Sequence, residues 1–423
     1  MAGLALSLLL GATVYLVYLG DRGPDQRDPD GPSSPSRSAS GNGSADESAL
    51  RADAAAGLLN RLSQVLQRGT RRQVVALAAS NQPAAGAELA TIRANVRALG
   101  VTNLSFRYVD EDGGRVDPAR QRALGGGGWV ANVQVTWRLR GFEQADSRME
   151  TTMTLVRTGR RAQFVSARGN YGNAVPLWML DRVAVARSRR SLVLAAEPDR
   201  TAPFARLANQ AVTDVRKVLP GWRGRLVVEV PSSQAELSRL LGADRDAYAG
   251  IAAVTTTADG SRSRRAPVHV FVNPKVFDPL GPRGSQIVMS HEATHVAVGA
   301  ATSTMPTWLL EGFADYVALA YVDLPVTAAA SQILAQVRKK GPPSHLPGRG
   351  EFDPENTALG ASYEAAWLAC RLLADEYGQR RLVEFYRQSD RLSSTTRPFR
   401  SVLHSDQQRF TRMWQRYLRS LAG

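Results

Sequence analysis

The sequence predicts an α+β protein: an N-terminal membrane helix, a domain of helices packed on a sheet, and a mostly helical C-terminal domain with a small mixed sheet. Three observations lead to this fold class. Residues 1–20 carry no charged side chain, and about twenty apolar residues are enough to cross a bilayer. Residues 48–172 show helical periodicity followed by strand-like alternation. Residues 286–301 are apolar nearly all round, which is typical of a buried helix.

The N-terminal segment predicts attachment to a membrane. Residues 1–20 lack the basic start and the cleavage site of a signal peptide, which favours an uncleaved transmembrane anchor over a signal segment. Residues 21–47 are rich in Asp, Ser, Pro and Gly and predict a disordered linker. We expect a single-pass protein of the cell membrane with its soluble domains on the extracytoplasmic side. The arginines after the span favour the opposite orientation, because basic residues stay on the cytoplasmic side; these are Arg22, Arg27 and Arg37.

Residues 48–172 form the first soluble unit. The pattern predicts three helices and then four strands, which is an α+β order. The helices are expected at 49–67, 71–80 and 88–99, and the strands at 104–109, 129–139, 149–157 and 162–168. This order resembles nuclear transport factor 2-like domains, in which helices pack on a curved sheet. The resemblance implies a binding or association module; the alternative is a spacer between membrane and C-terminal domain.

Residues 173–198 are interpreted as a connector that includes a strand at Ser191–Ala195. The C-terminal domain then covers residues 199–423. It is expected to begin with a helix at 202–218 and a strand at 225–230.

The chemistry of the chain is concentrated in His291-Glu292-Ala293-Thr294-His295. On a helix, His291 and His295 are four residues apart and project from one face, so they can hold one zinc ion. Glu292 beside them can activate a water molecule on that ion. On a second helix Glu311 can be the third ligand, and Asp315 shares its face and can accept a hydrogen bond from a ligating imidazole. The pattern predicts a catalytic site with one Zn²⁺ per chain and an open coordination position.

The two helical segments resemble the gluzincin group of zinc metallopeptidases, in particular its thermolysin-like and peptidase-MA-like members. The similarity lies in His291-Glu292-x-x-His295 and in Trp308-Leu309-Leu310-Glu311-Gly312-Phe313-Ala314, with Asp315 four residues after Glu311. It implies a zincin domain in which His291, His295 and Glu311 are metal ligands and Glu292 is the catalytic base. Fewer residues separate His295 from Glu311 than in thermolysin, so a thermolysin-like substrate preference does not carry over. We also expect Gly312 to let the two helices approach each other closely.

Two further features follow from this resemblance. A tyrosine often opens a helix near the metal in related peptidases, which makes Tyr363 the candidate catalytic donor to the oxyanion; the alternative is a tyrosine packed in the core. Such enzymes also bind an extended substrate along an exposed sheet edge. The strand at Val268–Val272 is the candidate edge, and His269 within it is interpreted as structural.

The predicted function is a membrane-tethered zinc metallopeptidase that hydrolyses peptide or protein substrates with a zinc-bound water activated by Glu292. The alternative is a non-catalytic cell-envelope binding or scaffolding protein with a degenerate peptidase domain. The net charge of +15 comes almost wholly from arginine and is compatible with anionic surfaces. No nucleic-acid motif accompanies it, so nucleic acid is not an expected partner. Cys370 is the single cysteine, which excludes an intrachain disulfide.

Overall fold

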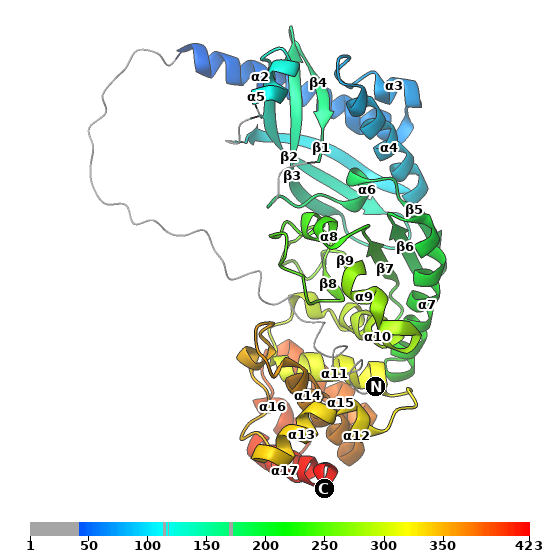
Figure 1. Cartoon of the computed structure of the whole chain (residues 1–423), viewed down its shortest axis with the longest axis vertical. Helices are drawn as coiled ribbons and strands as arrows, with labels where there is room; N and C mark the ends of the chain where they lie inside the picture. Colours follow the sequence, from blue (N-terminus) through cyan, green and yellow to red (C-terminus); the bar gives the residue numbers. More distant parts are fainter. Residues whose placement is uncertain (1–41, 113–115, 117, 169–171) are drawn as a thin grey trace, which may run out of the picture.

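The computed structural model describes residues 42–112, 116, 118–168 and 172–423 and has the predicted α+β class. A four-stranded sheet has the order β1-β2-β3-β4, and a five-stranded sheet has the order β5-β6-β7-β9-β8. Along the long axis of the molecule the four-stranded sheet comes first, then the five-stranded sheet, then a group of C-terminal helices (Figure 1).

The first unit consists of helices followed by an antiparallel meander, as the sequence predicts, with one additional short helix between the first two strands. Its helices are α2 (Asn42–Arg68), α3 (Arg71–Val75), α4 (Pro83–Leu99) and α5 (Pro118–Ala123). Its strands are β1 (Val101–Glu111), β2 (Gly128–Leu139), β3 (Ser147–Thr158) and β4 (Arg161–Ser166). The helix expected at 71–80 ends at Val75, because the next residues bond to β4 instead: Ala79 N donates to Phe164 O and Phe164 N donates to Leu77 O.

The linker prediction is wrong at its C-terminal end. Helix α2 already begins at Asn42, so residues 42–47 are helical. Within it, the Glu47 carboxylate lies 2.8 Å from the Arg157 guanidinium of β3. The predicted membrane segment at 1–20 lies outside the described residues. Of the helices that the structure describes, none combines the length and the hydropathy that a membrane crossing requires.

The five-stranded sheet draws two strands from the segment interpreted as a connector. These are β5 (Ala184–Arg187) and β6 (Ser191–Ala195); the strand prediction at Ser191–Ala195 is confirmed. Strand β6 pairs in parallel with β7 (Leu226–Val230), which pairs in parallel with β9 (Val268–Val272). Residues 173–198 are therefore not a simple connector, since they form one side of the second sheet.

The exposed edge of this sheet is not where the sequence placed it. Strand β9 lies inside the sheet, between β7 and β8 (Ala253–Thr257), and β8 is the edge. The chain leaves β8, turns, and returns as β9 in antiparallel register, with Thr255 opposite Val270. Strand β8, five residues that read Ala-Val-Thr-Thr-Thr, is not among the predicted strands.

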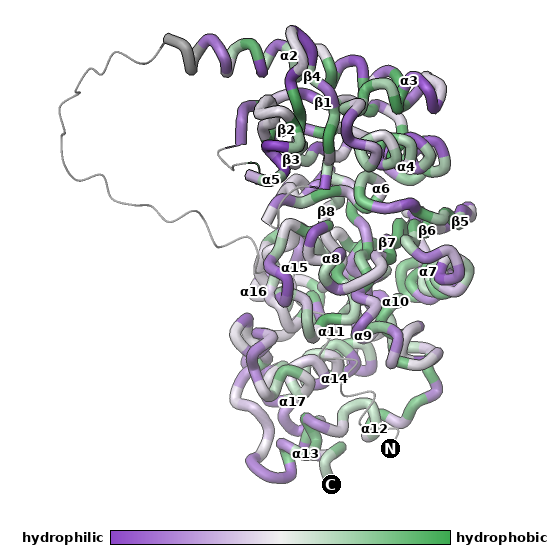
Figure 2. Tube along the Cα trace, turned by 45° about the horizontal axis from the view of Figure 1, so that its top comes forward, coloured by the Kyte–Doolittle hydropathy of each residue, from purple (hydrophilic) through white to green (hydrophobic). Residues whose placement is uncertain are grey.

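Both faces of the second sheet are buried, and this explains its nearly continuous hydrophobic strands. In β6, Val193 and Ala195 belong to a core with helices α7 (Thr201–Val218) and α10 (Gly281–Val298). Leu192 and Leu194 point the other way, into a core shared with the first unit. In Figure 2 the trace at β6 and β7 has the green colour of hydrophobic residues. The first unit therefore covers one face of the sheet and is more than a spacer.

The remaining elements are mainly helical. Helix α6 (Leu177–Leu180) is buried within the core shared with the first unit. The others are α8 (Gln234–Leu240), α9 (Pro274–Phe277), α11 (Thr307–Leu319), α12 (Val326–Ala329), α13 (Ser331–Lys340), α14 (Leu359–Tyr377), α15 (Gln379–Leu392), α16 (Thr396–Ser401) and α17 (Gln407–Ala422). Short 3₁₀ turns are η1 (Pro198–Arg200), η2 (Asp278–Leu280), η3 (Ala300–Thr302) and η4 (Arg349–Phe352).

Gly312 serves a close helix contact, but with a different partner from the one expected. A Cβ atom at Gly312 would lie 2.3 Å from the carbonyl oxygen of Ala366 and 3.1 Å from Cys370 Sγ, both on α14. The absence of a side chain at Gly312 thus lets α11 pack closely on α14, whereas the contact expected at Gly312 was with α10. Because Gly312 follows Glu311 directly, this contact also fixes the position of the candidate ligand.

Candidate metal centre

The structure brings together the three side chains that the sequence selects as metal ligands. His291 and His295 lie one turn apart on α10, and Glu311 faces them from α11. The two Nε2 atoms are 2.9 Å apart, and each lies 3.3 Å from Glu311 Oε2. All three residues are buried, with at most 5% of their surface exposed. This buried group can hold a metal ion.

Asp315 occupies the predicted position behind His291. Its Oδ1 lies 2.7 Å from His291 Nδ1, and Asp315 itself is buried one turn after Glu311 on α11. A carboxylate accepts the proton of Nδ1, so this contact assigns the hydrogen to Nδ1 and leaves the lone pair of Nε2 directed at the other two candidate ligands.

The geometry is close to that of a tetrahedral site. Ligands about 2.0–2.2 Å from a tetrahedral ion are about 3.3–3.6 Å from one another. The two Nε2–Oε2 separations of 3.3 Å match this range, and the Nε2–Nε2 separation of 2.9 Å is shorter. Two imidazole nitrogens this close, beside a carboxylate oxygen, can share a proton or be bridged by a metal ion. Three protein ligands leave a fourth position open, which is the arrangement of catalytic rather than structural sites.

The pKa values of His291 and Glu311 also indicate that this group of side chains attracts positive charge. Burial alone would lower the pKa of His291, but the Asp315 and Glu311 carboxylates raise that pKa well above its ordinary value. Burial alone would raise the pKa of Glu311, but the charges of His295 and His291 lower it to about 2. The site therefore holds an ionised carboxylate and attracts a cation, either protons or a metal ion.

Glu292 is fully buried beside the ligands and accepts a hydrogen bond from Thr255, which is not among the predicted site residues. Oγ1 of Thr255, on edge strand β8, lies 2.5 Å from Glu292 Oε2, and Oε1 has no hydrogen-bond partner in the described part of the chain. Burial raises the pKa of Glu292, and the His291 and His295 charges and the Thr255 hydrogen bond offset part of that rise. The run Thr255–Thr257 was the available sequence signal, because alternate residues of a strand face the same layer.

Tyr363 is completely buried near the start of α14, and its ring packs edge-on against Phe352 with centroids 5.1 Å apart. This packing is that of a core tyrosine, and its role as an oxyanion donor stays a prediction. Tyr386 on α15 is a second buried tyrosine, with its ring 4.4 Å from that of Phe313. Its hydroxyl has no hydrogen-bond partner within the described ranges. Burial raises its pKa well above the ordinary value, and the Asp390 and Glu311 charges add to this.

His269 lies away from the metal group, at the junction of the two sheets. Its Nδ1 is 2.7 Å from Glu229 of β7, and its Nε2 is 2.8 Å from Glu143 in the turn between β2 and β3. Burial opposes protonation, but the two carboxylates outweigh it and raise the pKa of His269 to about 9. This protonated imidazole links the first unit to the second sheet, which is a structural contact of the kind predicted for it.

Comparison of the chain with protein-family models, with curated proteins and with solved structures gave no match.

Proposed function

We propose that the chain is a zinc-dependent peptidase of the gluzincin type. The observation that carries this proposal is the buried triangle of His291, His295 and Glu311, with Glu292 adjoining it on the same helix. Two imidazoles and one carboxylate are a common ligand set of catalytic zinc, and a structural site has no use for the additional buried carboxylate.

Each residue has a defined task in this proposal. When bound, zinc polarises a carbonyl oxygen and lowers the pKa of water toward about 7. Glu292 Oε1 accepts a proton from the attacking water and later delivers it to the leaving amine. Thr255 holds Oε2 so that Oε1 faces the reaction, and Asp315 keeps the lone pair of His291 Nε2 directed at the metal.

The sheet edge supports a peptide as substrate. Strand β8 is at the end of the sheet, so its outer backbone groups can pair with an extended chain of any sequence. Thr255 belongs to this strand and contacts Glu292. A peptide paired with β8 would therefore lie beside the catalytic carboxylate. This assigns to β8 the role that the sequence analysis gave to Val268–Val272.

The cellular setting in this proposal comes from the sequence. Residues 1–20 would anchor the chain in the cell membrane, with the folded part outside the cytoplasm. The first unit would be a nuclear transport factor 2-like domain. The alternative of a non-catalytic scaffold is weaker, because it assigns no role to Glu292 or to the hydrogen bond that Thr255 makes with it.

The test measures zinc content and peptide hydrolysis with the full chain. The wild type is expected to contain about one zinc per chain, and His291→Ala and Glu311→Ala are expected to lose it. His404→Ala, a histidine outside the site, is the matched control and is expected to keep its zinc. Glu292→Gln is expected to retain zinc and lose hydrolysis of an unstructured protein such as casein. A zinc-free wild type, or equal hydrolysis by wild type and Glu292→Gln, would contradict the proposal.

A further inference from the structure

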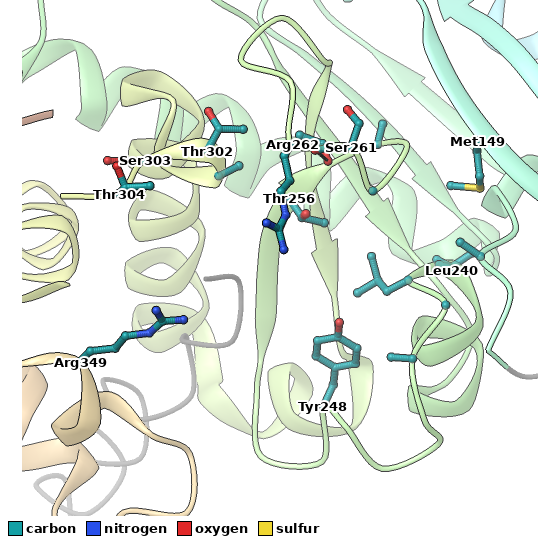
Figure 3. A pocket seen from close by; sticks show the side chains of 18 residues that line it. Met149, Leu240, Tyr248, Thr256, Ser261, Arg262, Thr302, Ser303, Thr304 and Arg349 are labelled. Carbon is teal, nitrogen blue, oxygen red and sulfur yellow. Dashed lines mark hydrogen bonds between the residues drawn. The ribbon is translucent and has the colours of Figure 1, made fainter. Parts of the chain in front are cut away.

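A cavity of about 620 Å³ follows the open edge of β8 and belongs to the proposed peptide site. Figure 3 shows Thr256 of β8 between Met149 on one side and Thr302 on the other. A second surface with a clear chemical character lies outside this site, on helix α17. It is strongly basic, whereas the cavity is lined mainly by apolar and hydroxyl side chains.

Helix α17 carries four arginines and no acidic residue. Arg409, Arg412, Arg416 and Arg419 are spaced so that each is three or four residues from the next, which places them on one face of the helix. All four are exposed. Neighbouring Cβ atoms at this spacing are about 5–6 Å apart, and the row extends about 15 Å along the helix axis. These four residues form the arginine stripe.

The opposite face of α17 is fixed in the core. Phe410, Trp414 and Leu418 are completely buried. The indole Nε1 of Trp414 donates a hydrogen bond of 3.1 Å to the Ala365 carbonyl oxygen of α14, and the Phe410 ring stacks 6.3 Å from that of Trp308 on α11. The helix is therefore held in one orientation, and the arginine stripe is positioned before any partner arrives.

The charge of the arginine stripe is not neutralised by neighbouring carboxylates. None of its four guanidinium groups lies within ion-pair distance of an acidic side chain in the described part of the chain. Asp406, the residue before α17, accepts the backbone N–H of Arg409 at 2.8 Å and caps the helix. Arginines elsewhere are paired, as Arg138 is with Asp146 at 2.8 Å.

Helix α13 adds positive charge beside the C-terminal end of the arginine stripe. Arg338 Nη1 donates to the Ala422 carbonyl oxygen at 3.5 Å, and the exposed Lys339 and Lys340 follow it. Among the described helices of ten or more residues, α13 and α17 are the two without an acidic residue. They lie together at the end of the molecule opposite the first unit (Figure 1).

We propose that the arginine stripe binds a linear phosphodiester polymer without bases, of the polyol phosphate or sugar phosphate class. A guanidinium group presents paired N–H donors that match the two free oxygens of a phosphodiester. A chain with one charge in each repeat meets the arginines of a row one after another. This inference goes beyond the proposed peptidase function and does not depend on it.

Two other anionic partners fit this surface less well. Proteins that bind single-stranded nucleic acid stack its bases on exposed aromatic side chains, and Phe410 and Trp414 are buried beneath the arginine stripe. Helices that bind at a lipid surface insert their apolar face among the acyl chains, and the apolar face of α17 is occupied by the core.

The test uses the full chain and a short fluorescent abasic oligonucleotide, which is a deoxyribose phosphate chain without bases. Binding is measured by anisotropy at several salt concentrations. If four phosphates are neutralised, log affinity should fall against log salt with a slope of about −3. A thymine oligonucleotide of equal length is expected to bind within about threefold of the abasic chain, because its bases find no aromatic platform. Phosphatidylglycerol vesicles are expected to bind more weakly at equal phosphate concentration.

Paired substitutions locate the binding surface. The variant with Arg412→Gln and Arg416→Gln is expected to bind about tenfold more weakly at about 50 mM salt and to show about half the salt slope. The variant with Arg412→Lys and Arg416→Lys keeps the charge and is expected to keep the slope, with a loss of about threefold for the missing paired donors. The matched control carries Arg160→Gln and Arg161→Gln, which removes two exposed arginines of the first unit, and is expected to bind like the wild type.

Urea denaturation of each variant separates lost contacts from lost folding, and the exposed positions predict unchanged midpoints. Failure of the wild type to bind the abasic chain, or an equal loss in the stripe variant and the control, would overturn the inference. Much tighter binding of the thymine oligonucleotide would identify a nucleic acid as the partner instead. Preference for the vesicles would identify a lipid surface, which also contradicts the proposal.

Discussion

The Thr255 hydroxyl lies 2.5 Å from Oε2 of Glu292, joining edge strand β8 to helix α10 at the proposed catalytic carboxylate. Thr255→Val removes this donor at nearly constant volume. We expect kcat/KM to fall about tenfold. The Thr255 hydrogen bond lowers the pKa of Glu292, so its loss raises that pKa and moves the acidic limb of the pH–rate profile to higher pH. The profile of Thr255→Ser should match the wild type. An unshifted acidic limb in Thr255→Val would exclude a role for this contact in tuning Glu292.

The bond from Asp315 to His291 predicts a change in metal affinity. Asp315→Asn keeps an acceptor for the Nδ1 proton but removes the charge that makes the imidazole a stronger ligand. Loss of such an outer contact typically weakens metal binding 10–100-fold. Competition with a chelator would measure this, with Asp323→Asn on the surface as the control. If both variants bind zinc as the wild type does, Asp315 does not support the metal site.

The link between His269 and the two glutamates predicts a pH-dependent stability. The pKa of His269 is raised in the folded state from 6.5 to about 9, so protonation favours folding. This contribution is complete below about pH 6.5 and is lost as the pH rises through about 9. We expect the free energy of unfolding in urea to fall over this range in the wild type and to change less in His269→Gln. The control His404→Gln should keep the wild-type dependence. A His269 pKa near 6.5 by NMR would contradict the prediction.

The contact of Gly312 with α14 predicts a clash on substitution. Gly312→Ala places a methyl group 2.3 Å from the Ala366 carbonyl oxygen, so the helices must separate. Overpacking of this kind costs about 1–3 kcal/mol in the free energy of unfolding, and the displacement of Glu311 should also weaken zinc binding. Urea denaturation provides the first measurement and metal competition the second. Gly250→Ala is the control, since a Cβ there meets no atom within 4 Å, and a Gly312→Ala variant as stable as this control would argue against the close contact.

The sequence predicts the site better than it predicts the sheet around it. The sequence places His291 one helical turn before His295, and Glu311 one helical turn before Asp315. This spacing is a local property, and the structure brings the two pairs together. The antiparallel order of the first unit also follows from local alternation and turns.

The order of the second sheet depends on pairings between distant segments. Strand β8 is short and rich in threonine, and its place outside β9 has no local signal. Thr255 was missed with it. Tyr386 was missed because it reaches the neighbourhood of Phe313 only through the packing of α15.

The shared core beneath the second sheet determines which part of the chain can exist alone. A fragment that starts at residue 199 would lack β5 and β6 and would leave Val227 and Phe271 uncovered by the first unit. Such a fragment should aggregate, whereas a chain that begins at α2 should retain both cores and fold. The two halves should melt together in one cooperative transition, and gene fusions or truncations that separate them should yield no folded protein.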